Sequence, residues 1–377
     1  MQFRDLKRQY EVLQKDIDVA MLEVARTGTY IMGSQVKKLE ERLAKFVGVK
    51  HCVTCGNGTD ALTLALKVWG IGRGDAVFVP DFTFFASAEA VALEGAVPVF
   101  VDVDKDTCNI DPVDLENNIE KTIKEGKYIP KVIIAVDLFG LPANYPVIRK
   151  IADKYSLLVL EDGAQGFGGA INDKRACSFG DISTTSFFPA KPLGCYGDGG
   201  AIFTDNDEWA KLADSYRVHG KGTFKYDNVR IGVNSRLDTL QAAILLVKLK
   251  AFEEKELAAV NNIAEKYTRL LKEKLKTPIV PEGFYSSWAQ YTIQLENKAQ
   301  RDSLQFKLKE RGIPSMVYYP TGMHAQTAFA NLTGQQNECP VASHLCDVVL
   351  SLPMHPYMTD DEIILIINSV ADGIKEM

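Results

Sequence analysis

The fold is decided by the stretch Leu157-Leu158-Val159-Leu160-Glu161-Asp162-Gly163-Ala164-Gln165. Four apolar residues in a row are typical of a strand buried on both faces, and here two acids and a glycine follow them at once. Similar short apolar runs recur at residues 76–79, 99–101 and 132–136, separated by segments of helix length. Such strands predict an α/β fold over about residues 50–205, with a mostly parallel sheet between layers of helices.

The pattern changes after residue 250. A helical stripe over residues 237–251 runs into a charged segment, and strand-like alternation then appears at residues 289–295. A last helix opens on a capping box formed by Thr359 and Glu362. A chain of 377 residues is long enough for two domains. We therefore expect a large α/β domain over residues 1–250 and a smaller α+β domain over residues 251–377.

The charge balance excludes several classes of partner. The chain carries 43 Lys and Arg against 49 Asp and Glu, a net charge of −6, so it lacks the basic excess of a nucleic-acid-binding protein. No apolar run approaches the roughly 18 residues of a membrane helix, and the first residues show no signal-peptide core. The seven cysteines are scattered, which is typical of reduced thiols. We expect a cytoplasmic protein without membrane or nucleic-acid partners.

Two further patterns have alternative interpretations. The turn Gly56-Asn57-Gly58-Thr59-Asp60-Ala61 leads from a short strand into a helix, where free N–H groups suit a phosphate. It also matches the G-x-G-x-x-A dinucleotide fingerprint, so a Rossmann-type dehydrogenase and a plain tight turn stay open. Cys52 and Cys55 have the spacing of a metal or redox pair, but no second pair completes a zinc site. We therefore predict no metal.

A lysine and an aspartate complete the set expected in this domain. Asp162 follows an apolar strand at the sheet edge where α/β proteins bind ligands, whereas Glu161 is interpreted as a loop acid or helix cap. Lys191 lies in an apolar loop, and apolar surroundings favour the neutral, nucleophilic amine. Arg236 is predicted in the first turn of a helix, where the helix dipole disfavours a cation, so an anionic ligand is indicated.

These features together are what pyridoxal 5′-phosphate requires: a phosphate-binding turn, a carboxylate for the pyridine nitrogen and an activatable lysine. The chain resembles the DegT/DnrJ/EryC1/StrS family of sugar aminotransferases, which have the aspartate-aminotransferase type of fold (fold type I). The resemblance is carried, in order, by motifs at residues 3–6, 28–33, 58–62, 80–84, 161–165, around Lys191 and Asn234, and at Tyr319, Pro320 and His324.

The resemblance implies a role for each matching position. Lys191 would be the Schiff-base and proton-transfer lysine, and Asp162 the partner of the pyridine nitrogen. The remaining cofactor contacts would be Gly58, Thr59, Phe84, Gln165, Ser186 and, from the neighbouring subunit of a homodimer, Asn234. Arg236, Tyr319 and His324 would contact the sugar. The unusual Thr321-Gly322-Met323 before His324 leaves the contacts of this histidine open.

The resemblance also narrows the reaction. Some relatives are dehydratases with histidine at the position of Lys191, so the lysine favours transamination, with L-glutamate as the expected amino donor. The residues of several motifs are most similar to those of the UDP-2-acetamido-2-deoxy-3-oxo-glucuronate 3-aminotransferases of O-antigen biosynthesis. This resemblance implies that Arg236 pairs with the uronate carboxylate of the sugar. Other 3-keto or 4-keto sugars linked to dTDP, UDP or GDP stay open, as does a non-catalytic regulator that binds the cofactor.

Overall fold

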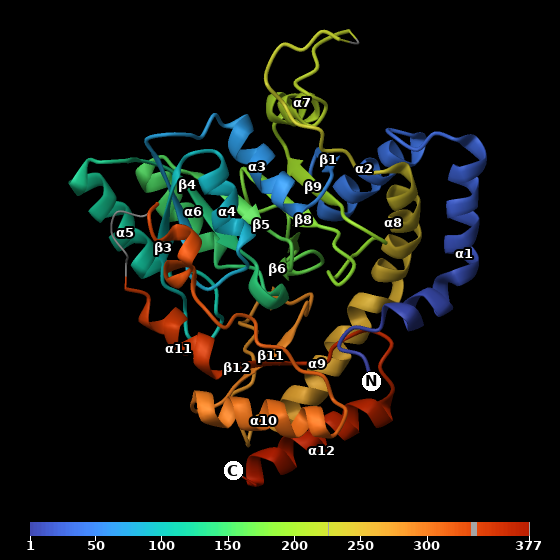
Figure 1. Ribbon diagram of the computed structural model, residues 1–377, viewed down its shortest axis with the longest axis vertical. Coiled ribbons are helices and arrows are strands. Elements are labelled where there is room, and N and C mark those ends of the chain that lie inside the picture. The colour runs from blue at the N-terminus through green and yellow to red at the C-terminus, as the bar shows by residue number, and fades with distance from the viewer. Residues whose placement is uncertain (225, 333–337, 377) are drawn as a thin grey trace.

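The computed structural model describes residues 1–224, 226–332 and 338–376. Within them the main sheet has seven strands in the order β1-β9-β8-β5-β4-β2-β3 (Figure 1). The bounds are β1 His51–Cys55, β2 Asp75–Pro80, β3 Val97–Val101, β4 Ile129–Val136, β5 Leu158–Asp162, β8 Ile182–Ser186 and β9 Gly200–Thr204. The strands from β8 to β3 run parallel, and β9 is antiparallel to both β8 and β1. The predicted mostly parallel sheet is confirmed.

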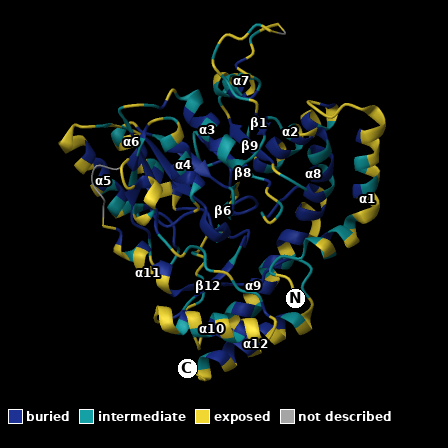
Figure 2. Ribbon diagram, in the orientation of Figure 1, coloured by how far each residue is buried: buried dark blue, intermediate teal, exposed yellow. Residues whose placement is uncertain are grey.

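Helices cover both faces of this sheet, and the strands between them are almost wholly buried (Figure 2). The helices are α2 Ser34–Val47, α3 Gly58–Val68, α4 Ala86–Leu93, α5 Pro112–Glu125, η1 Leu138–Gly140, α6 Tyr145–Tyr155, α7 Asp207–Tyr216 and α8 Thr239–Ala251. The four apolar runs noted in the sequence are β2, β3, β4 and β5. They carry apolar residues in succession because neither face of the strand meets water.

The C-terminal part begins where α8 continues through a π-helical turn, η2 Phe252–Glu256, into α9 Leu257–Leu271. Its elements are β11 Tyr291–Gln294, α10 Lys298–Glu310, η3 Met323–Ala325, η4 Thr327–Phe329, α11 Pro340–Val348, β12 Val349–Leu352 and α12 Asp360–Lys375. β11 and β12 pair antiparallel, and α10 and α12 lie on the outside (Figure 1). Thr359 and Glu362 form the predicted capping box. A domain boundary at residue 250 stays a prediction, since one apolar core contains residues from both sides.

Three short strands form a separate ribbon beside the main sheet. They are β6 Ala170–Ile171, β7 Lys174–Arg175 and β10 Phe284–Tyr285, in the order β10-β6-β7. Because β10 comes from the C-terminal part and the other two from the segment after β5, the ribbon fastens the two parts of the chain together.

The first helix, α1 Leu6–Thr27, was not expected from the sequence. It stands at the edge of the molecule beside α8 (Figure 1), and several of its apolar side chains face outward, with Val12, Val19 and Leu22 about half exposed or more. These outward apolar side chains accompany a buried face that includes Ile17 and Val24, and they weaken the contrast between the two faces on which periodicity depends. Across the described residues, no helix has the length and apolar character needed to span a membrane.

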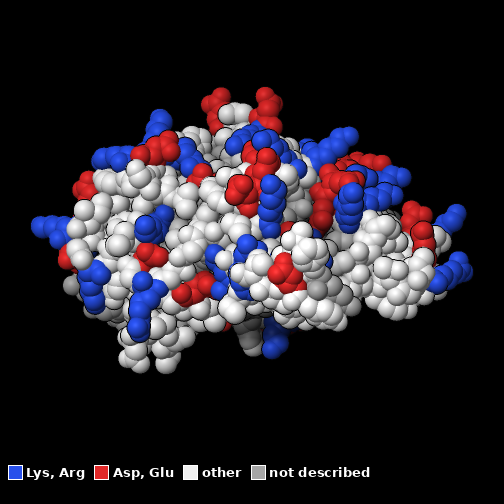
Figure 3. All heavy atoms as spheres, turned by 90° about the horizontal axis from the view of Figure 1, so that it is seen from above, with Lys and Arg blue, Asp and Glu red and all other residues white. Residues whose placement is uncertain are grey.

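Charges are mixed on the surface. On the face shown in Figure 3, basic and acidic side chains are interspersed rather than gathered into one basic patch. This distribution agrees with the net charge of −6. A protein that follows a nucleic-acid backbone needs a continuous basic track, and this face offers none.

Candidate active site

Asp162 is the last residue of β5, at the carboxyl edge of the parallel strands. The sequence had indicated that Glu161 and Asp162 follow the strand. The strand instead includes both acids, and each of them has hydrogen-bond partners inside the protein. Asp162 is 6% exposed, and its Oδ2 accepts a hydrogen bond from Ser87 Oγ at 2.7 Å. Ser87 lies on α4 and was not singled out in the sequence, where a lone serine gives no signal.

Glu161 points away from Asp162, as alternation along a strand requires. Its carboxylate accepts hydrogen bonds from the backbone N–H of Cys177 and of Phe179 and, at 2.7 Å, from Ser183 Oγ. Burial raises the pKa of Glu161, and these donors oppose the shift. The prediction of a loop acid or helix cap was wrong, since Glu161 is a buried strand residue that fixes the loop leading into β8.

Lys191 lies in the loop between β8 and β9. Burial lowers its pKa, the charge of Asp162 acts in the opposite direction, and the charge of Arg4 lowers it further. Among the described residues, its amino group has no hydrogen bond or ion pair. Its backbone N–H is held by Phe188 O at 2.9 Å, so the chain at this position is fixed while the amine stays available.

The glycine turn is the N-terminus of α3. Asn57 caps the helix by accepting a hydrogen bond from the N–H of Asp60 at 2.8 Å, which leaves the first N–H groups, those of Gly58 and Thr59, free for an anion. A Cβ at position 58 would lie 2.7 Å from the Cβ of Ser186. Only glycine therefore lets the helix end approach the end of β8, and the predicted phosphate contacts Gly58 and Ser186 do meet.

The helix expected around Arg236 begins later than predicted. α8 starts at Thr239 with Asp238 at its N-cap, so Asn234 and Arg236 lie in the extended segment before it, and the argument from the helix dipole was wrong. Ser235, between them, is buried; its hydroxyl accepts from the N–H of Gly56 at 2.9 Å and donates to Asp60 at 2.6 Å.

The flanking side chains of that segment face outward. Asn234 is exposed and Arg236 half-buried, and within the described residues the guanidinium of Arg236 has no carboxylate partner. A permanently charged group without a partner still indicates an anionic ligand, so Arg236 keeps its candidate role on a different observation.

Gln165 connects the strand edge with the C-terminal part. Its Oε1 accepts from the N–H of Phe139 at 2.8 Å, and its Nε2 donates to Tyr319 Oη at 3.1 Å. The ring of Phe84 lies 6.3 Å from that of Tyr319 and is 54% exposed. An exposed phenylalanine at the carboxyl edge of the sheet is available to cover a flat ligand, and the contact with the cofactor ring that the resemblance implies stays a prediction.

His324 is held by an acid that the sequence analysis missed. Asp81, directly after β2, is fully buried; its carboxylate accepts from the backbone N–H of His324 and pairs with Nδ1 of the same residue, each at 2.7 Å. Cys339 brings a third group of metal-ligand type within 4.8 Å of these two. The double hydrogen bond accounts for the position of His324, and the predicted contact with a sugar stays a prediction.

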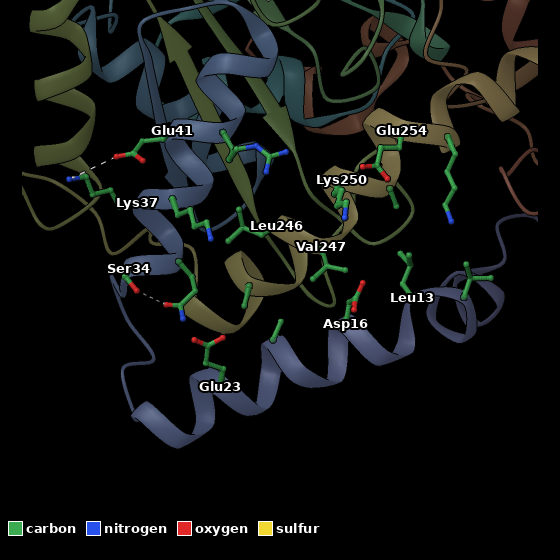
Figure 4. Close-up of a pocket in the computed structure, with 18 residues that line it drawn as sticks. Leu13, Asp16, Glu23, Ser34, Lys37, Glu41, Leu246, Val247, Lys250 and Glu254 are labelled. Carbon is green, nitrogen blue, oxygen red and sulfur yellow. Dashed lines mark hydrogen bonds and ion pairs between the residues drawn. The ribbon is translucent and has the colours of Figure 1, made fainter.

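A groove lies beside α1, away from these residues. The groove, of about 990 Å³, separates α1 from α2 and α8 and is lined by side chains such as Leu13, Asp16, Lys37, Val247 and Lys250 (Figure 4). None of the predicted site residues lines it. The groove therefore belongs to the packing of α1 and not to the candidate active site.

Comparison with known proteins decides the family. The model of the DegT/DnrJ/EryC1/StrS aminotransferase family matches residues 11–371. The chain belongs to this family. It is 46% identical to the UDP-2-acetamido-2-deoxy-3-oxo-D-glucuronate aminotransferase of Pseudomonas aeruginosa, over 95% of this chain and 96% of that one. It is 42% identical to a pleiotropic regulatory protein of Geobacillus stearothermophilus, over 98% and 97%. It is 40% identical to the UDP-N-acetyl-3-dehydro-alpha-D-glucosamine 3-aminotransferase of Acidithiobacillus ferrooxidans, over 95% and 94%.

Solved structures agree with the fold and with the cofactor. A family aminotransferase from Brucella abortus superposes with a TM-score of 0.95 at 48% identity, over 98% of both chains. NtdA of Bacillus subtilis, described with bound pyridoxamine phosphate, gives 0.90 at 30% identity, over 100% of this chain and 85% of that one. DegT/DnrJ/EryC1/StrS aminotransferases bind pyridoxal 5′-phosphate. The present site fits this group, because an unpartnered lysine, a buried aspartate and a helix N-terminus with free N–H groups converge on one edge of the sheet.

Proposed function

We propose that this protein is a pyridoxal-phosphate-dependent aminotransferase that moves an amino group from an amino acid, L-glutamate by resemblance, to a UDP-linked 3-keto-N-acetylhexosaminuronate. The observation that carries the proposal is the half-buried Lys191, whose amine has no partner in the described residues and is acted on by the charge of Asp162. A buried amine with a depressed pKa is suited to covalent and proton-transfer chemistry.

The cofactor would be held by residues of several elements. Gly58, Thr59 and Ser186 would bind its phosphate, Asp162 would face its ring nitrogen, and Gln165 and Phe84 would lie at its ring. When bound, the cofactor supplies an aldehyde that condenses with amines and a ring that withdraws electrons. The carboxylate of Asp162, held by Ser87, would keep a proton on the ring nitrogen.

Lys191 performs the proton transfer. Its Nζ takes the proton from the α-carbon of the amino donor, because burial keeps a larger share of this amine neutral. In the second half of the cycle, the same nitrogen would deliver a proton to the carbon of the sugar that receives the amino group. The two substrates would use the site in turn, in a ping-pong cycle.

The sugar substrate is inferred from Arg236 and from the relatives. Two relatives are named as aminotransferases of UDP-linked 3-keto sugars, one of them a uronate. An unpartnered arginine fork matches a carboxylate in a bidentate contact. We therefore assign the uronate carboxylate to Arg236 and propose surface-polysaccharide biosynthesis as the context.

Arg236→Ala should separate the two kinds of sugar. With L-glutamate as donor, we expect kcat/KM to fall roughly 10- to 100-fold for UDP-2-acetamido-2-deoxy-3-oxo-glucuronate, which loses a charge-assisted contact. The matched neutral sugar, UDP-N-acetyl-3-dehydroglucosamine, should change far less. The measurement is 2-oxoglutarate formation with each sugar. Equal losses on both sugars would remove Arg236 from uronate recognition, and turnover of only 4-keto sugars by the unaltered enzyme would refute the substrate.

We also propose that two subunits share each active site. Asn234 and Arg236 face outward on either side of Ser235, and several apolar side chains near them are exposed, among them Ile31 at 47% and Ile231 at 90%. A second subunit packed against this surface would cover these exposed apolar side chains. In a homodimer, Asn234 and Arg236 would enter the site of the neighbouring subunit.

Subunit complementation tests this arrangement. Lys191→Ala and Asn234→Ala proteins, each nearly inactive, should regain about a quarter of the normal activity when their subunits are mixed and reassociated, because half of the dimers then hold one intact site. Light scattering should give a dimer. If Lys191 and Asn234 served one site from the same subunit, mixing would restore nothing.

The cellular location follows as part of the proposal. All seven cysteines are free and buried, which fits a reducing compartment. We propose the cytoplasm, where nucleotide sugars and L-glutamate would be available to the enzyme, with no membrane or nucleic-acid partner.

A further inference from the structure

The segment Phe3–Asp5 lies between the loop that carries Tyr319 and the loop that carries Lys191. The ring of Phe3 meets that of Tyr318 edge-on, with 6.2 Å between the centroids, and Phe3 O accepts from the N–H of Met354 at 3.3 Å. On the other side, Arg4 donates from Nη2 to the carbonyl of Pro192 at 3.2 Å. Pro192 follows Lys191 directly. Arg4 therefore stands next to the reactive lysine, beside the loop that carries Tyr319.

Arg4 has no acidic partner at ion-pair distance in the described part of the chain. Burial lowers its pKa to about 10, and Glu256 is the acid whose charge opposes this shift. Glu256 is already engaged, because its Oε1 accepts from Gln9 Nε2 at 3.0 Å and also from the hydroxyl of Tyr357. Arg4 is half-buried, and a guanidinium with restricted access to water and no carboxylate beside it is stabilised when an anion joins it.

The surroundings of Arg4 add positive charge. Lys248 is 1% exposed, and its amino group has no hydrogen bond or ion pair within the described residues. Burial, and then the charge of Arg4, lowers the pKa of Lys248 to about 8, with Glu256 opposing. The charge of Arg4 thus acts on both Lys191 and Lys248, and the opposing acids are Asp162 at Lys191 and the already engaged Glu256 at Arg4 and Lys248. The balance favours a bound anion at Arg4.

We propose that Arg4 binds the α-carboxylate of the amino-acid donor. This inference rests on the proposed aminotransferase function and adds the residue that recognises the donor. In an amino acid, the carboxylate is attached to the very carbon whose proton Lys191 removes, so its anchor must stand beside the lysine. The carboxylate of a 3-keto uronate is separated from the reacting carbon by further ring atoms, so it needs a different anchor, the role proposed above for Arg236.

The test compares Arg4→Gln and Arg4→Lys with the unaltered holoenzyme, one half-reaction at a time. With L-glutamate alone, the absorbance change of the cofactor gives an apparent Kd for the donor. We expect Arg4→Gln to raise this Kd roughly 10- to 100-fold and Arg4→Lys to raise it less, because lysine keeps the charge but loses the fork. Binding of glutarate, a dicarboxylate without an amino group, should weaken in parallel by calorimetry.

Two controls separate a local effect from a structural one. Arg8→Gln removes a nearby arginine, in the first turn of α1, which pairs with Glu362 at 2.8 Å, and the donor Kd of this variant should stay within about twofold of normal. The second half-reaction, started from enzyme loaded with the amine form of the cofactor, should run normally with the keto sugar in Arg4→Gln. It also shows that the variant folds and binds the cofactor.

The outcomes separate the inference from the proposed function. An unchanged donor Kd in Arg4→Gln would overturn the inference alone, and so would equal slowing of both half-reactions. A selective loss of the sugar half-reaction would assign Arg4 to the sugar instead. If the unaltered holoenzyme showed no absorbance change with any amino acid, the aminotransferase function itself would fall, and the role of Arg4 with it.

Discussion

Lys191→Ala protein is expected to lose activity by a factor on the order of 10⁴ in both half-reactions, because one amine serves as attachment point and as proton carrier. The effect should exceed that of any other single substitution in the site. Lys191→Arg, which keeps the charge but raises the pKa of the group, should be almost as inactive. Residual turnover above a tenth of normal in either variant would contradict the assignment.

A chemical measurement checks the same prediction without turnover. Borohydride treatment of the cofactor-loaded protein should fix the cofactor to Lys191, adding its mass to the peptide that contains this residue. Lys191→Ala protein should gain no such mass. The result also distinguishes the rival functions: a Rossmann-type dehydrogenase would show no fixation, and a cofactor-binding regulator would show fixation without turnover of any amino donor.

Asp162→Asn should slow both half-reactions by roughly 100- to 1000-fold, since an amide gives no negative charge to hold a proton on the ring nitrogen. Single-turnover measurements with L-glutamate and with the keto sugar would check this. Slowing of the sugar half-reaction alone would contradict the role, because the ring nitrogen serves both halves equally.

The neighbouring acid provides the matched control for Asp162. Glu161→Gln should lower the free energy of unfolding by about 1 to 3 kcal/mol, because it leaves buried backbone donors poorly satisfied. Its rate constants per correctly folded active site should stay near normal. Thermal denaturation and cofactor titration together separate the two effects.

The sheet could be predicted because its central strands are apolar on both faces, so each appears as an uninterrupted run. Helix α1 could not, since its outward apolar side chains blur the periodicity. The start of α8 was misplaced because Asn234 and Ser235 resemble helix caps. Ser235 instead uses its hydroxyl on Gly56 and Asp60, a contact across the fold that no local pattern reveals.

In the candidate site, too, some residues could be predicted from local sequence and others could not. Lys191, Asp162 and the turn at Gly58 stand out because each combines a reactive or flexible residue with an unusual local context. Ser87, Asp81 and Arg4 are ordinary residues in ordinary contexts, and their importance comes from partners far away in the chain. The Phe3–Leu6 motif contributed to the family resemblance, yet it gave no role to Arg4.

The two adjacent acids at the end of β5 have a consequence for how this enzyme can change during evolution. Alternation sends Glu161 to the side on which it holds the loop before β8, and Asp162 to the side on which its proposed role in the chemistry lies. A slip of one residue in the pairing of β5 would exchange the two, damaging architecture and catalysis at once. The residue to which we assign the sugar carboxylate, Arg236, lies outside this strand. New sugar specificities can therefore arise in this lineage while the register of β5 stays fixed.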